Sequence, residues 1–279
     1  PVRVEVHVSS GVPGFTIVGL PDTSCREARD RVRAAILSCK LRWPDQRMTV
    51  NLAPSGVRKI GAGLDLAIAI GLLVATKQLP DSAQDLAYLG ELGLDGSVRP
   101  VVGGVPLAAS IDPTELVVAE GNAVEADVVG RHRVRPVGSL REIVACVTGE
   151  EPWSPPPTPR DVEPVTGLDL SDVRGNRLAR FALEVAAAGG HHLLYVGPPG
   201  AGKTMLAERL PGILGPLDDE GAIEVTTIHS AAGEALPANG LIRTPPFRAP
   251  HHTVSNIALV GGGSHVLKPG EISLAHRGV

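Results

Sequence analysis

The sequence predicts an α/β protein built from two domains. Three observations support this: short apolar runs alternate with helical patterns through residues 1–149, a proline-rich segment follows, and a complete phosphate-binding loop occupies residues 197–204. At 279 residues the chain is long enough for two hydrophobic cores. Because aromatic residues make up only 3% of the composition, we expect both cores to be aliphatic.

The first half of the first domain is predicted to contain three strands and two helices. Valine at every second position of residues 2–8 predicts a half-buried strand, and residues 15–20 predict a second. A capping-box pattern beginning at Ser24 opens a helix that places Val32, Ala35, Ile36 and Cys39 on one face. Residues 47–53 predict the third strand. The nearly all-apolar residues 64–75 predict a buried helix, too short to cross a membrane.

The second half of the first domain is predicted to begin with a β-hairpin. Residues 88–92 and 98–102 are strand-like and flank a tight turn at Asp95-Gly96. A helix, a strand and another helix are expected next, at residues 105–110, 116–119 and 140–148.

The clearest domain boundary is the proline-rich run of residues 152–159. Proline at this density excludes helix and central strand and predicts an extended linker. We therefore expect a first domain at residues 1–149, a linker at 150–164 and a second domain at 165–279.

The second domain is predicted to begin with a helix over residues 173–188. Leu178, Phe181, Ala182 and Val185 fall on one side of that helix and are expected to face its core. Residues 218–231 predict a further helix, because Asp218, Asp219 and Glu220 in its first turn would interact favourably with the helix dipole.

The phosphate-binding loop has the pattern G-x-x-x-x-G-K-[ST]. Its residues are Gly197, Pro198, Pro199, Gly200, Ala201, Gly202, Lys203 and Thr204. The apolar residues 191–196 before it predict a buried parallel strand, and residues 205–210 after it predict a helix, which is the expected context of this motif.

The chemistry of this loop predicts binding of ATP with Mg²⁺. The three glycines can adopt positive φ and let backbone N–H groups surround a polyphosphate. Lys203 would contact the β- and γ-phosphates, and the Thr204 hydroxyl would complete the Mg²⁺ shell. Lys203 is the only catalytic residue that we expect in this chain.

Composition and charge argue against a membrane partner, a histidine metal site and broad electrostatic binding of DNA. No run of 18 apolar residues and no signal peptide is present, so we expect no membrane partner. Three widely spaced cysteines predict free thiols in the reducing cytoplasm, and the histidines lack the spacing of a metal pair. The net charge of −4 divides equally between residues 1–151 and 152–279. Any DNA binding would therefore need a local patch, a pore in an oligomer or a region outside this chain.

Seven further motifs are more specific than the loop. Four follow it: PGIL at 211–214, FRAPHHT at 247–253, LVGGG at 259–263 and PGEISLAH at 269–276. Three precede it: SGVPGFTIVGLPD at 10–22, NLAP at 51–54 and GLDL at 63–66. Taken in the order in which they occur along the chain, these motifs resemble those of the ComM/YifB family of magnesium-chelatase-like AAA+ proteins. The resemblance covers essentially the whole chain.

The resemblance implies a fold for each domain and a function for the full-length protein. The first domain should have the ribosomal-S5-domain-2-like fold shared with Lon proteases, and the second should be part of the αβα subdomain of an AAA+ ATPase. Family members are ring-forming, hexameric, DNA-dependent ATPases, associated with branch migration in recombination and natural transformation. Two alternatives stay open: a magnesium-chelatase motor subunit acting on a partner enzyme, and a truncated nucleotide-binding protein without turnover.

The sequence departs from a complete family member in one respect. No apolar strand ending in Asp-Glu follows Thr204, although that pair would position Mg²⁺ and the attacking water. The chain also begins at Pro1 rather than methionine, and we expect it to be a fragment that binds nucleotide weakly and hardly hydrolyses it.

The Lon resemblance raises peptide hydrolysis as a rival activity. Its nucleophilic serine and activating lysine would lie near residues 61–63 and 103–106, but neither segment has the required side chain. Ser55 and Lys59 lie outside that pattern and are interpreted as a loop serine and a solvated lysine. The first domain is therefore expected to be non-proteolytic.

Two other groups have two interpretations each, and a third has one. By resemblance, residues 172–175 lie near adenine, although Asp172 could simply cap a helix. The segments 247–253 and 261–263 resemble a hairpin that points into the ring pore. The candidate DNA contacts in this region are Arg248, His251, His252 and Lys268. The alternative interpretation is interdomain or intersubunit packing. The basic residues at 131–135 are interpreted as a solvated strand edge.

Overall fold

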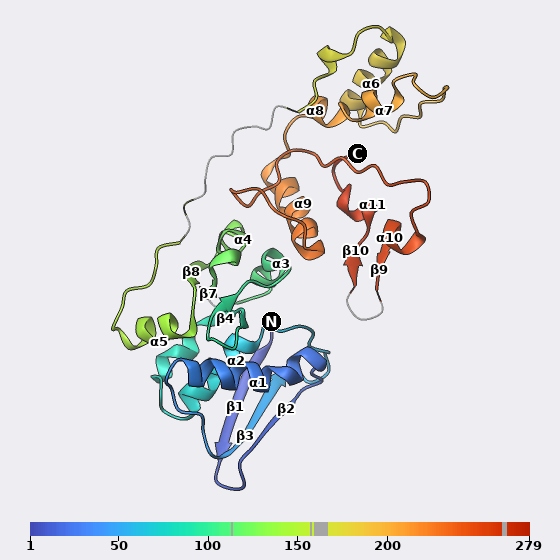
Figure 1. Ribbon diagram of the computed structural model, residues 1–279. Helices are drawn as coiled ribbons and strands as arrows, with labels where there is room; N and C mark the ends of the chain where they lie inside the picture. Colours follow the sequence, from blue (N-terminus) through green and yellow to red (C-terminus); the bar gives the residue numbers. More distant parts are fainter. Residues whose placement is uncertain (113, 157, 159–166, 264–266) are drawn as a thin grey trace. The chain divides into compact units, whose positions relative to one another are not determined.

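A computed structural model describes residues 1–112, 114–156, 158, 167–263 and 267–279. The chain divides into two compact units, Pro1–Thr158 and Pro159–Val279, which are considered separately (Figure 1). None of the helices in the described ranges combines the length and the apolar composition needed to cross a bilayer.

A three-stranded sheet forms one side of the first unit. Its central strand β3 (Arg47–Ala53) pairs antiparallel with β1 (Arg3–Ser9) and parallel with β2 (Gly14–Val18). Alternate residues of each strand pack into the core while their neighbours face solvent, as the valine pattern predicts. All three predicted strands are confirmed.

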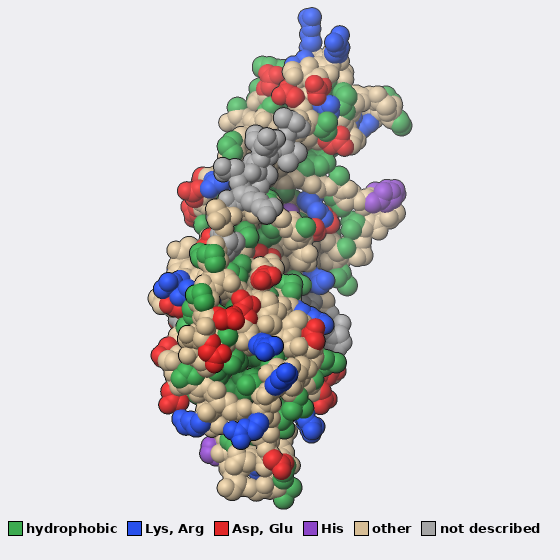
Figure 2. Space-filling model, turned by 60° about the vertical axis from the view of Figure 1, so that its left-hand side comes forward, with side chains coloured by type: hydrophobic (Ala, Val, Ile, Leu, Met, Phe, Trp, Pro, Cys, Tyr) green, Lys and Arg blue, Asp and Glu red, His purple; other side chains and the backbone are tan. Residues whose placement is uncertain are grey.

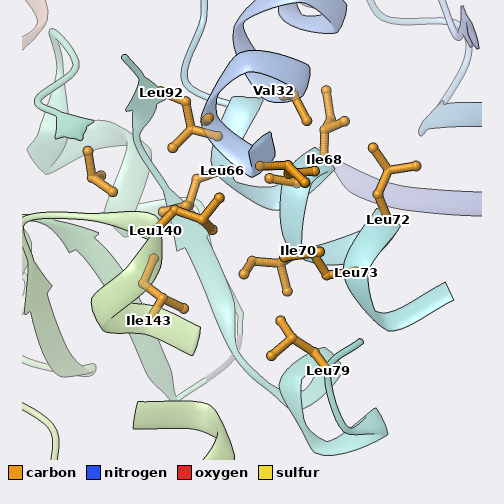
Figure 3. Close-up of a cluster of buried hydrophobic side chains, with 14 of the residues drawn as sticks. Val32, Leu66, Ile68, Ile70, Leu72, Leu73, Leu79, Leu92, Leu140 and Ile143 are labelled. Carbon is orange, nitrogen blue, oxygen red and sulfur yellow. The ribbon is translucent and has the colours of Figure 1, made fainter. Parts of the chain in front are cut away.

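Two helices cover the inner face of this sheet, α1 (Thr23–Ser38) and α2 (Asp65–Ala75) (Figure 1). Figure 3 shows the aliphatic side chains that α2 contributes to the core, including Leu66, Ile68 and Leu72, which are at most 1% exposed. The buried helix and the aliphatic core are thereby confirmed. The prediction that a capping box at Ser24 starts α1 was wrong. The N-cap is Asp22, two residues earlier, whose carboxylate accepts a hydrogen bond from the Cys25 N–H at 2.8 Å.

A buried ion pair joins the two helices. The Arg31 guanidinium of α1 donates to both oxygens of Asp65, through Nε at 2.6 Å and Nη2 at 3.1 Å. Asp65 is 1% exposed and opens α2, and it also accepts the Leu92 N–H at 3.4 Å. The carboxylate thus links α1, α2 and the hairpin.

The predicted hairpin is present, but its first strand divides at Gly90. Glu91–Leu92 (β5) pairs antiparallel with Val98–Arg99 (β6), whereas Ala87–Leu89 (β4) joins a different sheet. A Cβ at Gly90 would lie 2.8 Å from a Val98 methyl group, so only glycine fits where the chain passes between the two sheets. A short 3₁₀ turn, η1 (Asp81–Asp85), precedes β4.

The second sheet of the first unit is parallel. Its strand order is β4-β7-β8, with β7 at Glu115–Ala119 and β8 at Arg133–Val137. The connecting elements are α3 (Gly104–Ala109), η2 (Glu120–Asn122), α4 (Ala123–Val128) and α5 (Leu140–Thr148). The predicted elements at 105–110, 116–119 and 140–148 are confirmed. A strand near β8 was implied only by the strand edge at residues 131–135, and α4 had not been predicted.

The first residues of the proline-rich segment contact the first unit. The Arg135 guanidinium lies 5.5 Å from the centre of the Trp153 ring, and the Pro152 carbonyl accepts the Cys146 thiol at 3.5 Å. Residues 157 and 159–164 of the predicted linker lie outside the described residues.

The second unit consists mainly of short helices. In chain order its elements are η3 (Leu170–Asp172), α6 (Arg177–Gly189), α7 (Lys203–Ala207), α8 (Leu210–Leu214), α9 (Asp219–Ala232), α10 (Asn256–Val260), β9 (Gly261–Gly262), β10 (Lys268–Pro269) and α11 (Glu271–Leu274). A small core of Leu170, Val173, Leu183 and Leu206 joins η3, α6 and α7. The helix predicted at 218–231 is confirmed as α9, with Asp218 as its N-cap.

The strand predicted at residues 191–196 was wrong. Residues 191–196 form no strand, and the side chains of Leu194 and Val196 are 84% and 87% exposed. A parallel strand needs a neighbour, and the strands described in this unit, β9 and β10, pair only with each other.

The buried face of α6 also differs from the prediction. Leu183 and Ala186 are buried, whereas Leu178 and Phe181 are 81% and 62% exposed. The core lies on the other side of the helix, so periodicity located an apolar face but not the one that contacts this core. The helix begins at Arg177 rather than at residue 173, because η3 and a left-handed Asn176 precede it.

The ion pair between α1 and α2 yields a stability prediction. Asp65→Ala would leave the partly buried Arg31 guanidinium, 18% exposed, without its main partner, and we expect the free energy of unfolding to fall by about 2 kcal/mol. Asp30→Ala, an exposed change on α1, should alter it by less than ~0.5 kcal/mol. Urea unfolding of both variants measures the difference, and equal stabilities would contradict the assigned role of Asp65.

Candidate nucleotide-binding site

The phosphate loop leads directly into α7. Gly200 and Gly202 adopt the left-handed region, with φ of +78° and +84°, whereas Gly197 does not, so the expectation of positive φ is met at two of the three glycines. Residues 197–201 are exposed, and the loop backbone is therefore accessible to a ligand. The loop and its turn into a helix are formed even though the predicted strand before them is not.

Lys203 closes this loop. Its Nζ donates to the Gly197 carbonyl at 2.9 Å and to the Pro198 carbonyl at 2.8 Å. The ammonium thus lies against the first two residues of the same motif, at the open side of the turn. Polyphosphate oxygens would be stronger acceptors than these carbonyls, because hydrogen bonds between two ionised groups are the strong ones.

Thr204 is exposed in the first turn of α7, while Leu206 of the same helix is buried in the small core. Leu206 therefore anchors α7 and presents the Lys203 and Thr204 side chains at the surface. The helix predicted at 205–210 instead spans Lys203–Ala207, and α8 begins at Leu210.

The segment before α6 lies beside the loop. A Cβ at Gly202 would lie 3.3 Å from the Asn176 amide nitrogen and 3.1 Å from the Met205 methyl group, so both side chains would have to shift slightly, and the φ of +84° itself favours glycine. Asn176 has φ of +47° and makes no capping hydrogen bond to α6. Sequence reasoning missed Asn176. Asn is one of the few residues that tolerate this conformation, which was the available signal.

Asp172 does not cap α6, contrary to one of its two interpretations. It belongs to η3, where it forms a reciprocal capping box with Asp169, and it lies 3.6 Å from the Arg209 guanidinium. The Arg180 guanidinium donates to the Val173 carbonyl at 3.0 Å and fixes the segment against α6. These contacts fix Asp172 and Val173, and Asn176, which follows them, lies next to the loop.

The candidate DNA contacts in the second unit differ in their availability. Arg248 forms two hydrogen bonds with Glu271, at 2.6 and 2.8 Å, and the pair lowers the pKa of Glu271. His251, His252 and Lys268 are exposed, and the two imidazole rings lie 4.1 Å apart. Lys268 lies on the small hairpin that β10 forms with β9.

A second ionic cluster holds the segment after α11 against α9. Glu224 accepts from the Arg277 guanidinium at 2.6 Å and contacts the His276 ring at 3.0 Å. The hydrogen bond from Arg277, followed by that from His276, lowers the pKa of Glu224 to about 2. His229 adds a contact to the Leu274 carbonyl at 3.0 Å.

The two segments where the Lon resemblance would place a dyad are neighbours. A Cβ at Gly63 would contact a Val101 methyl group at 3.5 Å, and α3 begins just after, at Gly104. The solvated interpretation of Lys59 was wrong: this residue is only 3% exposed, and its ammonium donates to the Pro54 carbonyl. Ser55 is exposed, as expected of a loop serine.

The basic residues at 131–135 also differ from a freely solvated edge. The Arg131 guanidinium donates to the carbonyls of Ala109 and Ile111 at the end of α3, the second at 2.7 Å. Arg135 pairs with Glu115 of the neighbouring strand at 3.2 Å. These side chains therefore stabilise the first unit.

Two family models match the chain. The one described as "Magnesium chelatase, subunit ChlI" covers residues 169–279, and "Subunit ChlI of Mg-chelatase" covers residues 4–122. The chain is also similar, over its whole length, to "Competence protein ComM" of Haemophilus influenzae (44% identity) and to "Uncharacterized protein YifB" of Escherichia coli (42%). The chain belongs to the ComM/YifB family of magnesium-chelatase-like proteins.

ComM/YifB relatives are longer than this chain. An uncharacterized protein of Mycobacterium tuberculosis is 47% identical over 282 residues, and these cover all of this chain but 56% of the relative. The share is likewise 56% for the Haemophilus ComM protein and 55% for the Escherichia YifB protein. Membership of the ComM/YifB family makes this chain a relative of AAA+ ATPases. The chain itself has a mixed α/β fold that includes a parallel sheet.

The Glu224 cluster predicts a dependence on pH. A carboxylate whose pKa is lowered by folding stabilises the folded state above its unfolded pKa, about 4.3, and loses that contribution as the pH falls towards 2. Glu224→Gln should therefore speed hydrogen exchange in residues 271–279 at pH 7, with a difference from the wild type that shrinks towards pH 2. Glu234→Gln, an exposed control near the end of α9, should behave like the wild type at both pH values. A difference that persists unchanged at low pH would contradict the ionic explanation.

Proposed function

We propose that residues 197–204 bind ATP with Mg²⁺, and that the full-length protein is a ring-forming ATPase that couples hydrolysis to DNA remodelling. The observation that carries this proposal is the Lys203 ammonium, held by the Gly197 and Pro198 carbonyls over an exposed glycine loop. The residues fit the ligand: an accessible loop backbone, one ammonium and the exposed Thr204 hydroxyl. Mg²⁺ would supply charge neutralisation between the phosphates.

In this proposal each residue of the site has a distinct task. Lys203 exchanges its two carbonyl partners for phosphate oxygens, and its positive charge stabilises the charge on the triphosphate. The backbone N–H groups of the loop bind phosphate oxygens, and the Thr204 hydroxyl holds the metal. Asn176 lies beside Gly202 of the loop, and residues 172–175, which precede it, are proposed to contact the nucleoside.

The proposed DNA role is supported by the name of a relative and not by any feature of the phosphate loop. The Haemophilus relative, 44% identical, is named as a competence protein, and we extend this to branch migration in recombination or transformation. The ring is proposed to be a cytoplasmic homohexamer. The first unit is proposed to be a non-proteolytic scaffold with a Lon-like fold, because residues 61–63 and 103–106 have neither serine nor lysine.

A magnesium-chelatase motor subunit acting on a partner enzyme is the second candidate. The descriptions of both matching family models favour it. Salt-dependent DNA binding by the full-length protein would favour DNA remodelling, whereas stimulated insertion of a metal into a porphyrin would favour the chelatase. A nucleotide-binding protein without turnover would give neither result.

The ATPase rate of the full-length protein, with and without branched DNA, tests the proposed function. We expect branched DNA to raise the rate and Lys203→Ala to abolish it, because removing the ammonium removes a main charge contact to the triphosphate. Lys77→Ala, an exposed lysine of the first unit, is the control and should keep the wild-type rate. An unchanged rate with DNA would refute the remodelling role. The 279-residue chain alone should hardly hydrolyse ATP, because no strand ending in Asp-Glu follows Thr204.

The position of Gly202 predicts a binding defect that is separable from a loss of stability. Gly202→Ala would place a methyl group against Asn176 and Met205 and strain the left-handed backbone, so protection of the loop from proteolysis by Mg-ATP should be lost. Gly215 has a similar φ, +77°, with no atom within 4 Å of its added Cβ, and Gly215→Ala is the matched control. Equal protection of both variants by Mg-ATP would contradict the assigned role of the loop.

A further inference from the structure

Opposite charges are segregated along the first unit. Residues 1–80 contain eleven Lys and Arg but six Asp and Glu, whereas residues 81–158 contain five and twelve. The small net charge of this unit hides the difference between its two halves. On the face drawn in Figure 2, Lys and Arg side chains are interspersed with Asp and Glu side chains, so any positive surface must be local. A segregated distribution creates a local positive field even when the net charge is negative.

One helix presents part of this positive charge as a stripe. Arg26, Arg29 and Arg33 of α1 are all exposed, and their spacing of three and four residues places them on the same side of the helix. The neighbouring side of the helix is the apolar face, which packs into the core through Cys25, Ala28, Val32, Ala35 and Ile36. The guanidinium groups are therefore fixed to a rigid element and directed away from the core.

These arginines are not engaged in ion pairs. Within the described parts of the chain, no carboxylate lies within 4.0 Å of the guanidinium groups of Arg26, Arg29 or Arg33. Arg31 on the same helix, by contrast, binds Asp65 and lies 3.6 Å from Glu27. The exposed Asp30 lies four residues after Arg26 and three before Arg33 but forms no ion pair with either, so their guanidinium groups stay available to an external anion.

Basic residues extend the stripe beyond both ends of the helix. Lys59 forms a β-bridge with Pro21, which precedes the Asp22 cap, so the exposed Arg58 lies near the start of α1. The exposed Lys40 follows its last turn.

We propose that Arg26, Arg29 and Arg33, extended by Arg58, bind the phosphate backbone of DNA. Guanidinium groups bind phosphate oxygens in pairs, and an array along one helix can contact successive phosphates without reading the base sequence. A membrane surface fits less well, because the apolar face that would enter the lipid is already buried in the core. This surface rests on the proposed DNA role for its partner but is separate from the nucleotide site.

Binding of this chain to a fluorescein-labelled DNA duplex, without nucleotide, tests the proposal. The test variant is Arg26→Gln/Arg29→Gln/Arg33→Gln, and Arg99→Gln/Arg141→Gln/Arg177→Gln removes three exposed charges from other elements as a control. Because Gln and Arg have similar helix propensity, we expect both variants to fold, as a thermal unfolding scan will show. Between about 50 and 200 mM salt, the slope of log affinity against log salt should fall by roughly two to three in the test variant.

The outcomes separate this surface from the other proposals. At about 50 mM salt the test variant should bind roughly tenfold or more weakly than the control. No binding by the wild-type chain, or equal binding by the two variants, would overturn the proposal. So would equally tight binding of phosphatidylserine vesicles that is lost in the same variant, because the surface would then be a general anion site. Lys203→Ala should retain this binding, so a failed nucleotide site leaves the result interpretable.

Discussion

The hydrogen bonds from the Lys203 ammonium to the Gly197 and Pro198 carbonyls are the contacts on which the functional account depends. They draw the loop around the one cation of the motif, and the buried Leu206 fixes the helix that carries it. Because the backbone of residues 197–201 stays exposed, the same geometry that satisfies the lysine leaves the loop accessible to an anion. The loop is therefore closed by contacts within residues 197–203, while the core shared with η3 and α6 anchors the helix that follows it.

The two units differ in how their cores are built. The first has a continuous aliphatic core between a mixed sheet and two helices, fastened by the buried pair of Arg31 and Asp65. The second has a small core around η3, α6 and α7, and ionic contacts such as Glu224 with Arg277 and Arg248 with Glu271 hold its last residues in place. Apolar side chains such as Leu194 and Val196 stay in contact with solvent there.

Sequence patterns predicted the first unit well because its signals are local. The valine alternation of β1 and the apolar run of α2 each identify an element from a few neighbouring residues. The phosphate loop was equally easy to recognise, because its G-x-x-x-x-G-K-[ST] pattern is a run of eight consecutive residues. The strand at 191–196 was not, because a strand exists only when a partner lies beside it, and an apolar pattern cannot supply that partner.

Long-range contacts explain the remaining differences. Whether Lys59 is solvated depends on where the Pro54 carbonyl lies, and the buried face of α6 depends on where η3 and α7 pack. The proximity of Asn176 to Gly202 joins residues 26 positions apart, so the sequence alone gave no direct sign of it. Family membership, by contrast, followed from short motifs whose order is itself a long-range signal, and the comparisons confirmed it.

Titration calorimetry of the folded 279-residue chain with Mg-ATP tests the central claim most directly. The account predicts a weak but saturable heat that disappears when Lys203 is replaced by alanine, since the ammonium would then no longer meet the triphosphate. A folded sample that gives no heat, or the same heat without the lysine, would contradict it.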